Sequence, residues 1–193
     1  TQLDATYEQL NAALGFKTSP VTGLWFNIYG GYQDLKNNLA SAAIANYSGS
    51  YLQLLQGNMH NIYAGAEASY SYKDIISFTA SGIYRDWKTA KTENNSGDQL
   101  LYYMPSFEAN FKVDIRPISS VLINLGYQHI TREKIGNERV DPVGNLYLGG
   151  SYEVFEGISI YVRANNLLNK DYQYYPGYPT EGINFMGGVS FRF

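Results

Sequence analysis

Apolar and polar side chains alternate along most of this 193-residue chain, and the alternation recurs in about nine separate segments. Successive side chains of a β-strand point to opposite faces, so a period of two residues predicts strands with one apolar and one polar face. The clearest segment closes the chain, where the apolar positions are Ile183, Phe185, Val189, Phe191 and Phe193. The pattern therefore predicts a sheet rather than a helical fold.

The other eight segments repeat this pattern, and their apolar positions begin at Leu10, Leu24, Ile62, Ile76, Tyr103, Val121, Leu146 and Ile158. Most segments are long enough to cross a bilayer as tilted strands, which takes about 9–11 residues. Their polar positions carry mainly Asn, Ser, Gln, Gly and Tyr, whereas the solvent face of a soluble sandwich carries many Lys and Glu. We therefore predict an all-β fold, an antiparallel transmembrane β-barrel wall, with a soluble β-sandwich as an alternative.

The composition agrees with a barrel and excludes other classes. Charged residues make up only 16% of the chain, against roughly 25% in typical soluble proteins, and 19 residues are Tyr. A helical membrane protein needs runs of about 20 apolar residues, and the sequence has none; its mean hydropathy is -0.29. A net charge of -3 argues against a nucleic-acid partner.

The predicted connections between strands are alternately short and long. Short turns are expected at 19–20, 73–74, 116–118 and 156–157, and long connections at 36–58, 88–98, 133–142 and 168–182. Bacterial barrels join their strands in this way, with short periplasmic turns and longer extracellular loops. The C-terminus falls at the end with the short turns. We therefore expect a bacterial outer-membrane protein with a periplasmic C-terminus and extracellular long loops.

The C-terminal region carries a recognisable motif. The stretch VRANNLLNKDY from Val162 to Tyr172, followed by a Tyr/Pro/Gly loop and a last strand ending in GGVSFRF, resembles the signature of TonB-dependent outer-membrane receptors. The loop PGYPTEGIN from Pro176 to Asn184 is similar to receptors of Bacteroidetes-type bacteria. The asparagines of the motif, Asn165, Asn166 and Asn169, can bond nearby backbone and tolerate left-handed φ. We interpret them as a strand-end device that marks the family without doing its chemistry.

The resemblance implies a barrel of about 22 strands around a lumen plugged by an N-terminal domain. At about 10 residues per strand, 193 residues cannot supply them. We therefore expect residues 1–193 to be the C-terminal segment of a larger barrel, about nine strands of it, with the plug domain not in this chain. The implied partners are outer-membrane lipid, the remainder of the barrel with its plug, TonB through the missing N-terminal part, and the barrel-assembly machinery.

The function implied by the resemblance is TonB-energised uptake of a scarce nutrient, such as a siderophore, haem, cobalamin or a glycan. A passive porin-like channel or a small intact outer-membrane barrel is the alternative, and a soluble carbohydrate-binding β-sandwich is a third. No enzyme site, cofactor or metal site is expected. The two histidines, His60 and His129, are far apart in sequence without ligand-spaced partners, and they are expected at the rim or in the lumen.

Two groups of residues are candidates for function. Aromatic side chains suit stacking on a small-molecule or glycan ligand, and the loop 168–182 offers Tyr172, Tyr174, Tyr175 and Tyr178. Packing within the loop is an equally good interpretation of these tyrosines. In the last strand, Val189, Phe191 and Phe193 resemble the recognition signal for the barrel-assembly machinery, and the same residues also suit a lipid-facing position.

Overall fold

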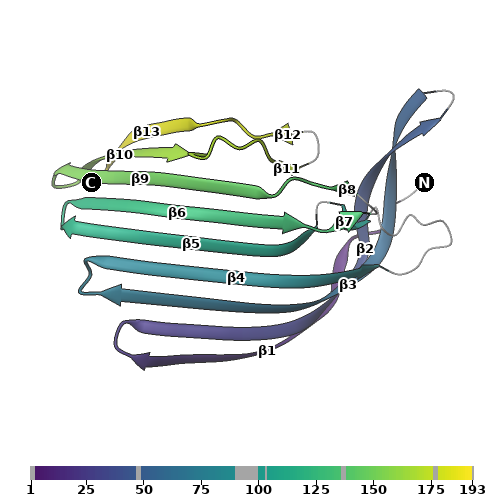
Figure 1. The fold of residues 1–193 in the computed structure, drawn as a ribbon, viewed down its shortest axis with the longest axis horizontal. Helices are drawn as coiled ribbons and strands as arrows, with labels where there is room; N and C mark the ends of the chain where they lie inside the picture. The colour runs from purple at the N-terminus through teal and green to yellow at the C-terminus, as the bar shows by residue number, and fades with distance from the viewer. Residues whose placement is uncertain are drawn as a thin grey trace.

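One antiparallel sheet of nine strands dominates the computed structural model, which describes residues 3–46, 49–89, 100–102, 104–135, 138–175 and 178–192 (Figure 1). Its strands, in spatial order, are β1 (Tyr7–Val21), β2 (Leu24–Asn46), β3 (Gly49–Tyr72), β4 (Ile76–Thr89), β5 (Pro105–Ile118), β6 (Val121–Arg132), β9 (Val143–Phe155), β10 (Ile158–Asn165) and β13 (Asn184–Phe191). The prediction of about nine strands is confirmed. The sheet is open, with β1 and β13 at its edges.

Two small hairpins lie in the long connections of the sheet. One pairs β7 (Lys134–Ile135) with β8 (Glu138–Arg139), and the other pairs β11 (Gln173–Tyr175) with β12 (Tyr178–Pro179). In the part of the chain that the structure describes, no helix is long and apolar enough to cross a membrane.

The strand register places the apolar positions of all nine strands on one face. Leu125 of β6 lies between Val113 of β5 and Leu148 of β9, whereas the preceding Asn124 pairs with Asp114. Because antiparallel partners point to the same side, these pairings extend the alternation of each strand across the whole sheet. We refer to the two sides as the apolar face and the polar face.

Large side chains of the apolar face are exposed. Leu14 is 87% exposed and Phe185 is 79% exposed, and Val162 and Phe191 are also largely exposed. Among the described residues no second sheet covers this face. The soluble β-sandwich alternative is therefore wrong, because a sandwich buries its apolar positions between two sheets. An uncovered apolar surface of this extent requires an apolar environment.

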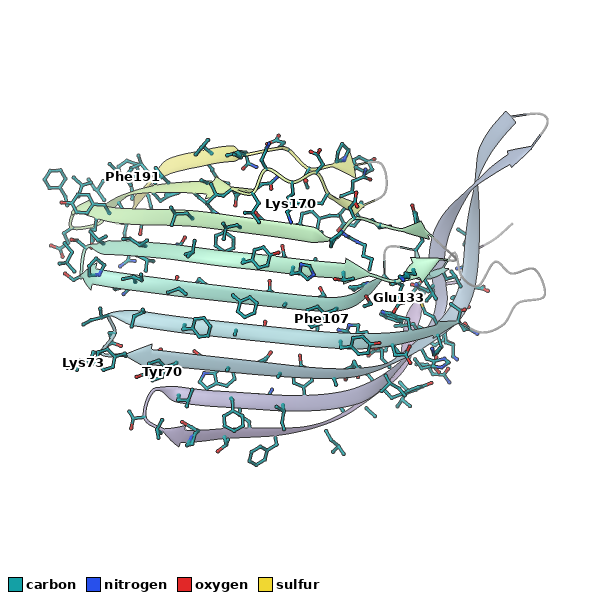
Figure 2. All side chains as sticks on the ribbon, viewed as in Figure 1. Tyr70, Lys73, Phe107, Glu133, Lys170 and Phe191 are labelled. Carbon is teal, nitrogen blue, oxygen red and sulfur yellow. The ribbon has the colours of Figure 1, made fainter. Side chains whose placement is uncertain are left out.

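The short turns and the C-terminal strand end lie at one end of the sheet, and the long connections lie at the other, as predicted (Figure 1). In Figure 2, Lys73 marks the short-turn end and Glu133 the long-connection end. Two turns occur where the sequence predicted them. Lys73 and Asp74 both adopt positive φ, of 48° and 55°, and Gly157 has a φ of 80°. At these positions a left-handed backbone reverses the chain.

The other two turns lie two or three residues beyond their predicted positions, at 22–23 and 119–120. The prediction was wrong because proline was taken to end each strand. Pro20 lies at a register shift between Thr18 and Val21, and Pro117 lies at one between Ile115 and Ile118. Both are places where a strand tolerates the missing N–H of proline.

The first long connection is a hairpin and not a loop, so the prediction of a loop over 36–58 was wrong. After a bulge at Leu35 and Asn38, β2 and β3 resume pairing, and the ladder continues until Asn46 pairs with Gly49. Residues 38–46 contain no Gly or Pro that would interrupt the strand. The paired strands therefore extend well past the rest of the wall (Figure 1).

Candidate functional site

The polar face carries a chain of hydrogen-bonded side chains across β1 to β4. Gln33 Nε2 donates to Glu8 Oε2 at 2.5 Å, and Asn61 Nδ2 donates to Gln33 Oε1 at 2.9 Å. Arg85 donates to Asn61 Oδ1 at 3.5 Å. Asn61 is fully buried within this network. Polar groups removed from water in this way stabilise a single arrangement of side chains when each is paired.

Four tyrosines of the polar face lie flat over glycines of the neighbouring strand. The pairs are Tyr29 with Gly65, Tyr63 with Gly31, Tyr147 with Gly126, and Tyr161 with Gly188. The glycines are necessary for close approach, since a Cβ at Gly31 would lie 2.6 Å from the ring of Tyr63. The rings replace the side-chain packing that glycine lacks within a strand.

Two guanidinium groups lie over these rings. Arg85 lies 5.3 Å from the ring centroid of Tyr63, and Arg163 lies 4.2 Å from that of Tyr147. The attraction between a cation and an aromatic face holds each arginine against the wall. The polar face is therefore a surface of tyrosine rings, amides and guanidiniums, which suits a hydrated interior or a polar protein partner.

A hollow of about 580 Å³ lies on the polar face near the short turns, next to Lys112 and Asp114. Lys112 forms an ion pair with Asp114 at 2.8 Å. The other carboxylate oxygen of Asp114, Oδ1, is buried and accepts no hydrogen bond from the described residues. A donor from outside this wall could satisfy it. The described residues include no cluster of three or more His, Cys, Asp or Glu able to hold a metal ion.

The C-terminal motif organises the last long connection around one buried asparagine. Asn166 Nδ2 donates to the carbonyl oxygens of Lys170 and Glu181, both at 3.0 Å, and its Oδ1 accepts from Lys170 N at 3.1 Å. Asn166 N donates to Asn145 Oδ1 at 2.9 Å. The side-chain amide of Asn166 therefore uses both of its N–H groups and one of the two lone pairs of its oxygen.

Left-handed backbone accompanies these hydrogen bonds at two of the three predicted asparagines, whereas Asn165 remains in β10 and bonds the side chains of Arg163 and Asn184. Asn166 has a φ of 51° and Asn169 a φ of 48°. Asn169 Oδ1 also accepts from Ile183 N at 3.3 Å, which ties the start of the loop to the start of the last strand. The interpretation of the motif as a strand-end device is thus supported by its geometry.

The four candidate tyrosines of this loop have different environments. Tyr172 is only 5% exposed and its ring contacts that of Tyr174 edge-on, at 5.6 Å between centroids. Burial, with the neighbouring Tyr174, raises the pKa of Tyr172 to about 12. The hydroxyl of Tyr174 donates to Gln128 Oε1 of the polar face at 2.8 Å. These two tyrosines pack the loop against the wall.

Tyr175 and Tyr178 are open to solvent, at 73% and 74% exposed. The structure therefore leaves two of the four predicted tyrosines available for a ligand. In the last strand, Val189 and Phe191 lie on the apolar face, and Figure 2 places Phe191 at the short-turn end. Phe193, the third residue of the predicted assembly signal, lies outside the described residues.

Sequence reasoning missed Arg132, which joins two of the long connections. Its side chain is buried and donates to the carbonyl oxygen of Gln173 at 2.7 Å and to that of Asp141 at 3.3 Å. Arg132 is the last residue of β6, at the long-connection end of the sheet. Nothing in the local sequence separates it from the other arginines, because its partners lie in loops distant along the chain.

The rim of the apolar face at the long-connection end is charged. Lys36 pairs with Asp34 at 3.0 Å, and Lys88 pairs with Asp86 at 3.1 Å. Burial raises the pKa of Glu133, and the nearby Asp86 raises it further. The register also places His60 and His129 on this face, at the rim. The rim was one of their two predicted positions, and the lumen was the other. The apolar face therefore ends in a polar border.

No family model and no curated protein matches the sequence. Solved structures do match the fold. The copper transporter OprC superposes with a TM-score of 0.71 at 17% identity, covering 95% of this chain and 31% of that one. The FrpB iron transporter from Neisseria meningitidis gives 0.69 at 15% identity, covering 99% and 32%. The ferric-catecholate import receptor Fiu from E. coli K12 gives 0.67 at 14% identity, covering 95% and 27%.

These three structures are TonB-dependent outer-membrane receptors, the family that the C-terminal motif resembles. Identities this low establish the fold alone, and the chain has the fold of part of their barrel wall. It spans about a third of the length of these three structures.

Proposed function

We propose that this chain is the C-terminal part of the barrel wall of a TonB-dependent outer-membrane receptor, and that the whole protein takes up a scarce nutrient by TonB-energised transport. The observation that carries the proposal is the pair of opposed faces. An exposed apolar face continues across nine strands, and the other face is lined with tyrosines, amides and paired charges. A wall between hydrocarbon and a wet or plugged lumen has this arrangement.

The open edges of the sheet support a larger barrel. β1 and β13 are edge strands, and unpaired N–H and C=O groups at a sheet edge are not stable in lipid. Further strands on both sides would close the wall and satisfy these groups. On this proposal, residues 1–193 form one segment of the barrel. The polar face, with the unsatisfied Asp114 oxygen, faces a plug domain supplied by the rest of the protein.

The orientation follows from the ends of the sheet. The short turns and the C-terminus would lie in the periplasm, and the hairpin of β2 and β3 and the loop 168–182 outside the cell. A ligand arriving from outside would then meet Tyr175 and Tyr178, the exposed tyrosines. By their names, the three matching receptors transport copper, iron and ferric catecholates. A metal chelate or another small nutrient is therefore the ligand class that we propose.

Assembly would involve the last strand. Val189 and Phe191 lie on the apolar face, where the barrel-assembly machinery could bind them before the strand enters lipid. Phe193 belongs to the same proposed signal by its place in the sequence. The remaining proposed partners are TonB, which would act through the N-terminal part of the whole protein, and outer-membrane lipid.

Ion conductance of the full-length protein distinguishes a plugged receptor from a passive channel. In planar lipid bilayers we expect the full-length protein to show no steady conductance, because a plug would fill its lumen. Deleting the domain upstream of the barrel should open a large, stable pore. A steady conductance of the undeleted protein would contradict the proposal and favour the porin-like alternative.

A further inference from the structure

Hollows indent the apolar face, and glycine creates one of them. It has a volume of about 510 Å³ and lies over β9, β10 and β13. The register places Val162 between Gly150 and Gly187, so this level of the face has one side chain where three strands meet. Leu148 and Phe185 form part of its lining. A slender apolar molecule can lie in such a hollow without displacing side chains.

The ammonium group of Lys170 lies on the same face, closer to the long connections. A Cβ added to Gly144 of β9 would lie 3.3 Å from Tyr127 Oη and 3.9 Å from Lys170 Nζ, so both groups approach the apolar face at this glycine. Gly144 pairs with His129, whose ring stacks on that of Tyr127. Figure 2 shows Lys170 beside β9 and β10. Lys170 forms no ion pair with a carboxylate of the described residues.

The spacing between this cation and the hollow matches one leaflet of a bilayer. Gly144 and Leu148 are separated by about 13 Å along β9, and Gly144 and Gly150 by about 20 Å, at about 3.3 Å per residue. Tilt of the strands shortens both distances along the membrane normal. Half of a hydrocarbon core measures about 15 Å. The cation therefore lies near the level of lipid head groups when the hollow lies among acyl chains.

The second hollow provides a comparison within the same wall. It has a volume of about 440 Å³ and lies over small residues of β3 to β5, including Ala66 and Gly82. The lysines at the rim on this side, Lys36 and Lys88, are already paired with aspartates. A paired lysine attracts an anion much less than an unpaired one does. The first hollow thus combines an apolar cleft with a cation available for an anionic group, a combination that the second hollow lacks.

We propose that Lys170 and Tyr127 bind the phosphate of an outer-leaflet lipid whose acyl chain lies in the hollow over Gly150 and Gly187. This inference rests on the proposed function, because it requires the apolar face to meet lipid. The ammonium of Lys170 supplies charge. The hydroxyl of Tyr127 lies 3.5 Å from His129 Nδ1, and it donates its proton to a phosphate oxygen when that nitrogen carries a hydrogen. Because the phosphate and the acyl chain of the same lipid are both bound, that lipid occupies one defined position on the wall.

The test measures lipid retention by the full-length protein in phosphatidylcholine vesicles containing diphosphorylated lipid A. Native mass spectrometry after extraction counts the lipid A molecules that remain bound. Lys170→Gln should weaken retention about fivefold, as expected for one cation near a lipid surface. Gly150→Leu should lower it similarly by filling the hollow, since a Cβ there meets only Leu122 O, at 3.5 Å.

Two matched controls should retain lipid A like the wild type. Lys88→Gln removes a lysine already paired with Asp86, and Gly82→Leu fills the second hollow. Equal retention by Lys170→Gln and the wild type would overturn the proposal, and so would equal retention of lipid A lacking its phosphates. Heat-modifiable migration on gels reports assembly separately. If the wild type failed to assemble in the vesicles, the membrane-spanning function itself would fall, and the lipid site with it.

Discussion

Replacing Asn166 by alanine is expected to lower the free energy of unfolding by about 3 kcal/mol, since three side-chain hydrogen bonds are lost and each contributes roughly 1 kcal/mol. The carbonyl oxygens of Lys170 and Glu181 would lose their donor, and Lys170 N would lose its acceptor. These bonds connect the two ends of the loop that carries Tyr175 and Tyr178. The loop should therefore lose its order together with its stability.

Urea unfolding of the full-length protein in phospholipid vesicles measures this effect, with two control variants. Asn166→Gly removes the same hydrogen bonds but tolerates the φ of 51°, so it should be nearly as unstable as the alanine variant. Asn165→Ala removes one exposed hydrogen bond with Arg163 and one part-buried hydrogen bond with Asn184. It should cost about 1 kcal/mol, because water can replace the exposed bond. A wild-type unfolding midpoint for Asn166→Gly would show that the buried amide does not hold the loop.

A charge placed on the apolar face is expected to be as damaging. Leu125→Arg, midway along β6, should destabilise the assembled barrel by about 2–4 kcal/mol, the cost of an arginine facing the middle of a bilayer. The adjacent Asn124 lies on the polar face beside Asp114. Asn124→Arg should therefore change the stability by less than about 1 kcal/mol.

The same urea titration in vesicles compares the two arginine variants. Their substitutions are one residue apart, so strand propensity and distance from the turns are nearly matched. A difference in stability between the two variants therefore reports the face on which each residue lies, and not its position along β6. If Asn124→Arg were the more damaging of the two, the assignment of the faces would be reversed.

The fold was predictable because its main signal is local. The alternation of β6 can be read from Val121 to Gln128 without knowledge of any other strand. The errors arose where tertiary context overrode a local rule. Pro20 remained within a strand because the register of β1 and β2 shifts between Thr18 and Val21. The alternation in 38–46 continued into a paired hairpin because β3 offered a partner strand of similar length.

The candidate site was less predictable, because its features depend on which strands are neighbours. Tyr172 and Tyr175 look alike in the sequence, but one packs against Tyr174 and the other is exposed. The lengthwise alternation could not show that Tyr147 lies over Gly126, because that contact depends on the register between β6 and β9. The left-handed backbone of Asn166 and Asn169 was predictable because asparagine tolerates it, although Asn165, of the same residue type, stayed in β10.

The opposed environments of the two faces can be measured residue by residue along β6. The sequence contains no Cys, so single cysteines placed from 121 to 128 can each carry a spin label within this segment. With the full-length protein in lipid vesicles, oxygen collides preferentially with labels in hydrocarbon, and a water-soluble nickel chelate collides with labels in water. We predict high oxygen accessibility at Ile123 and Leu125, and lower oxygen accessibility at Leu122, Asn124 and Gly126. An oxygen accessibility that does not alternate along β6, or nickel access to Leu125, would contradict the account.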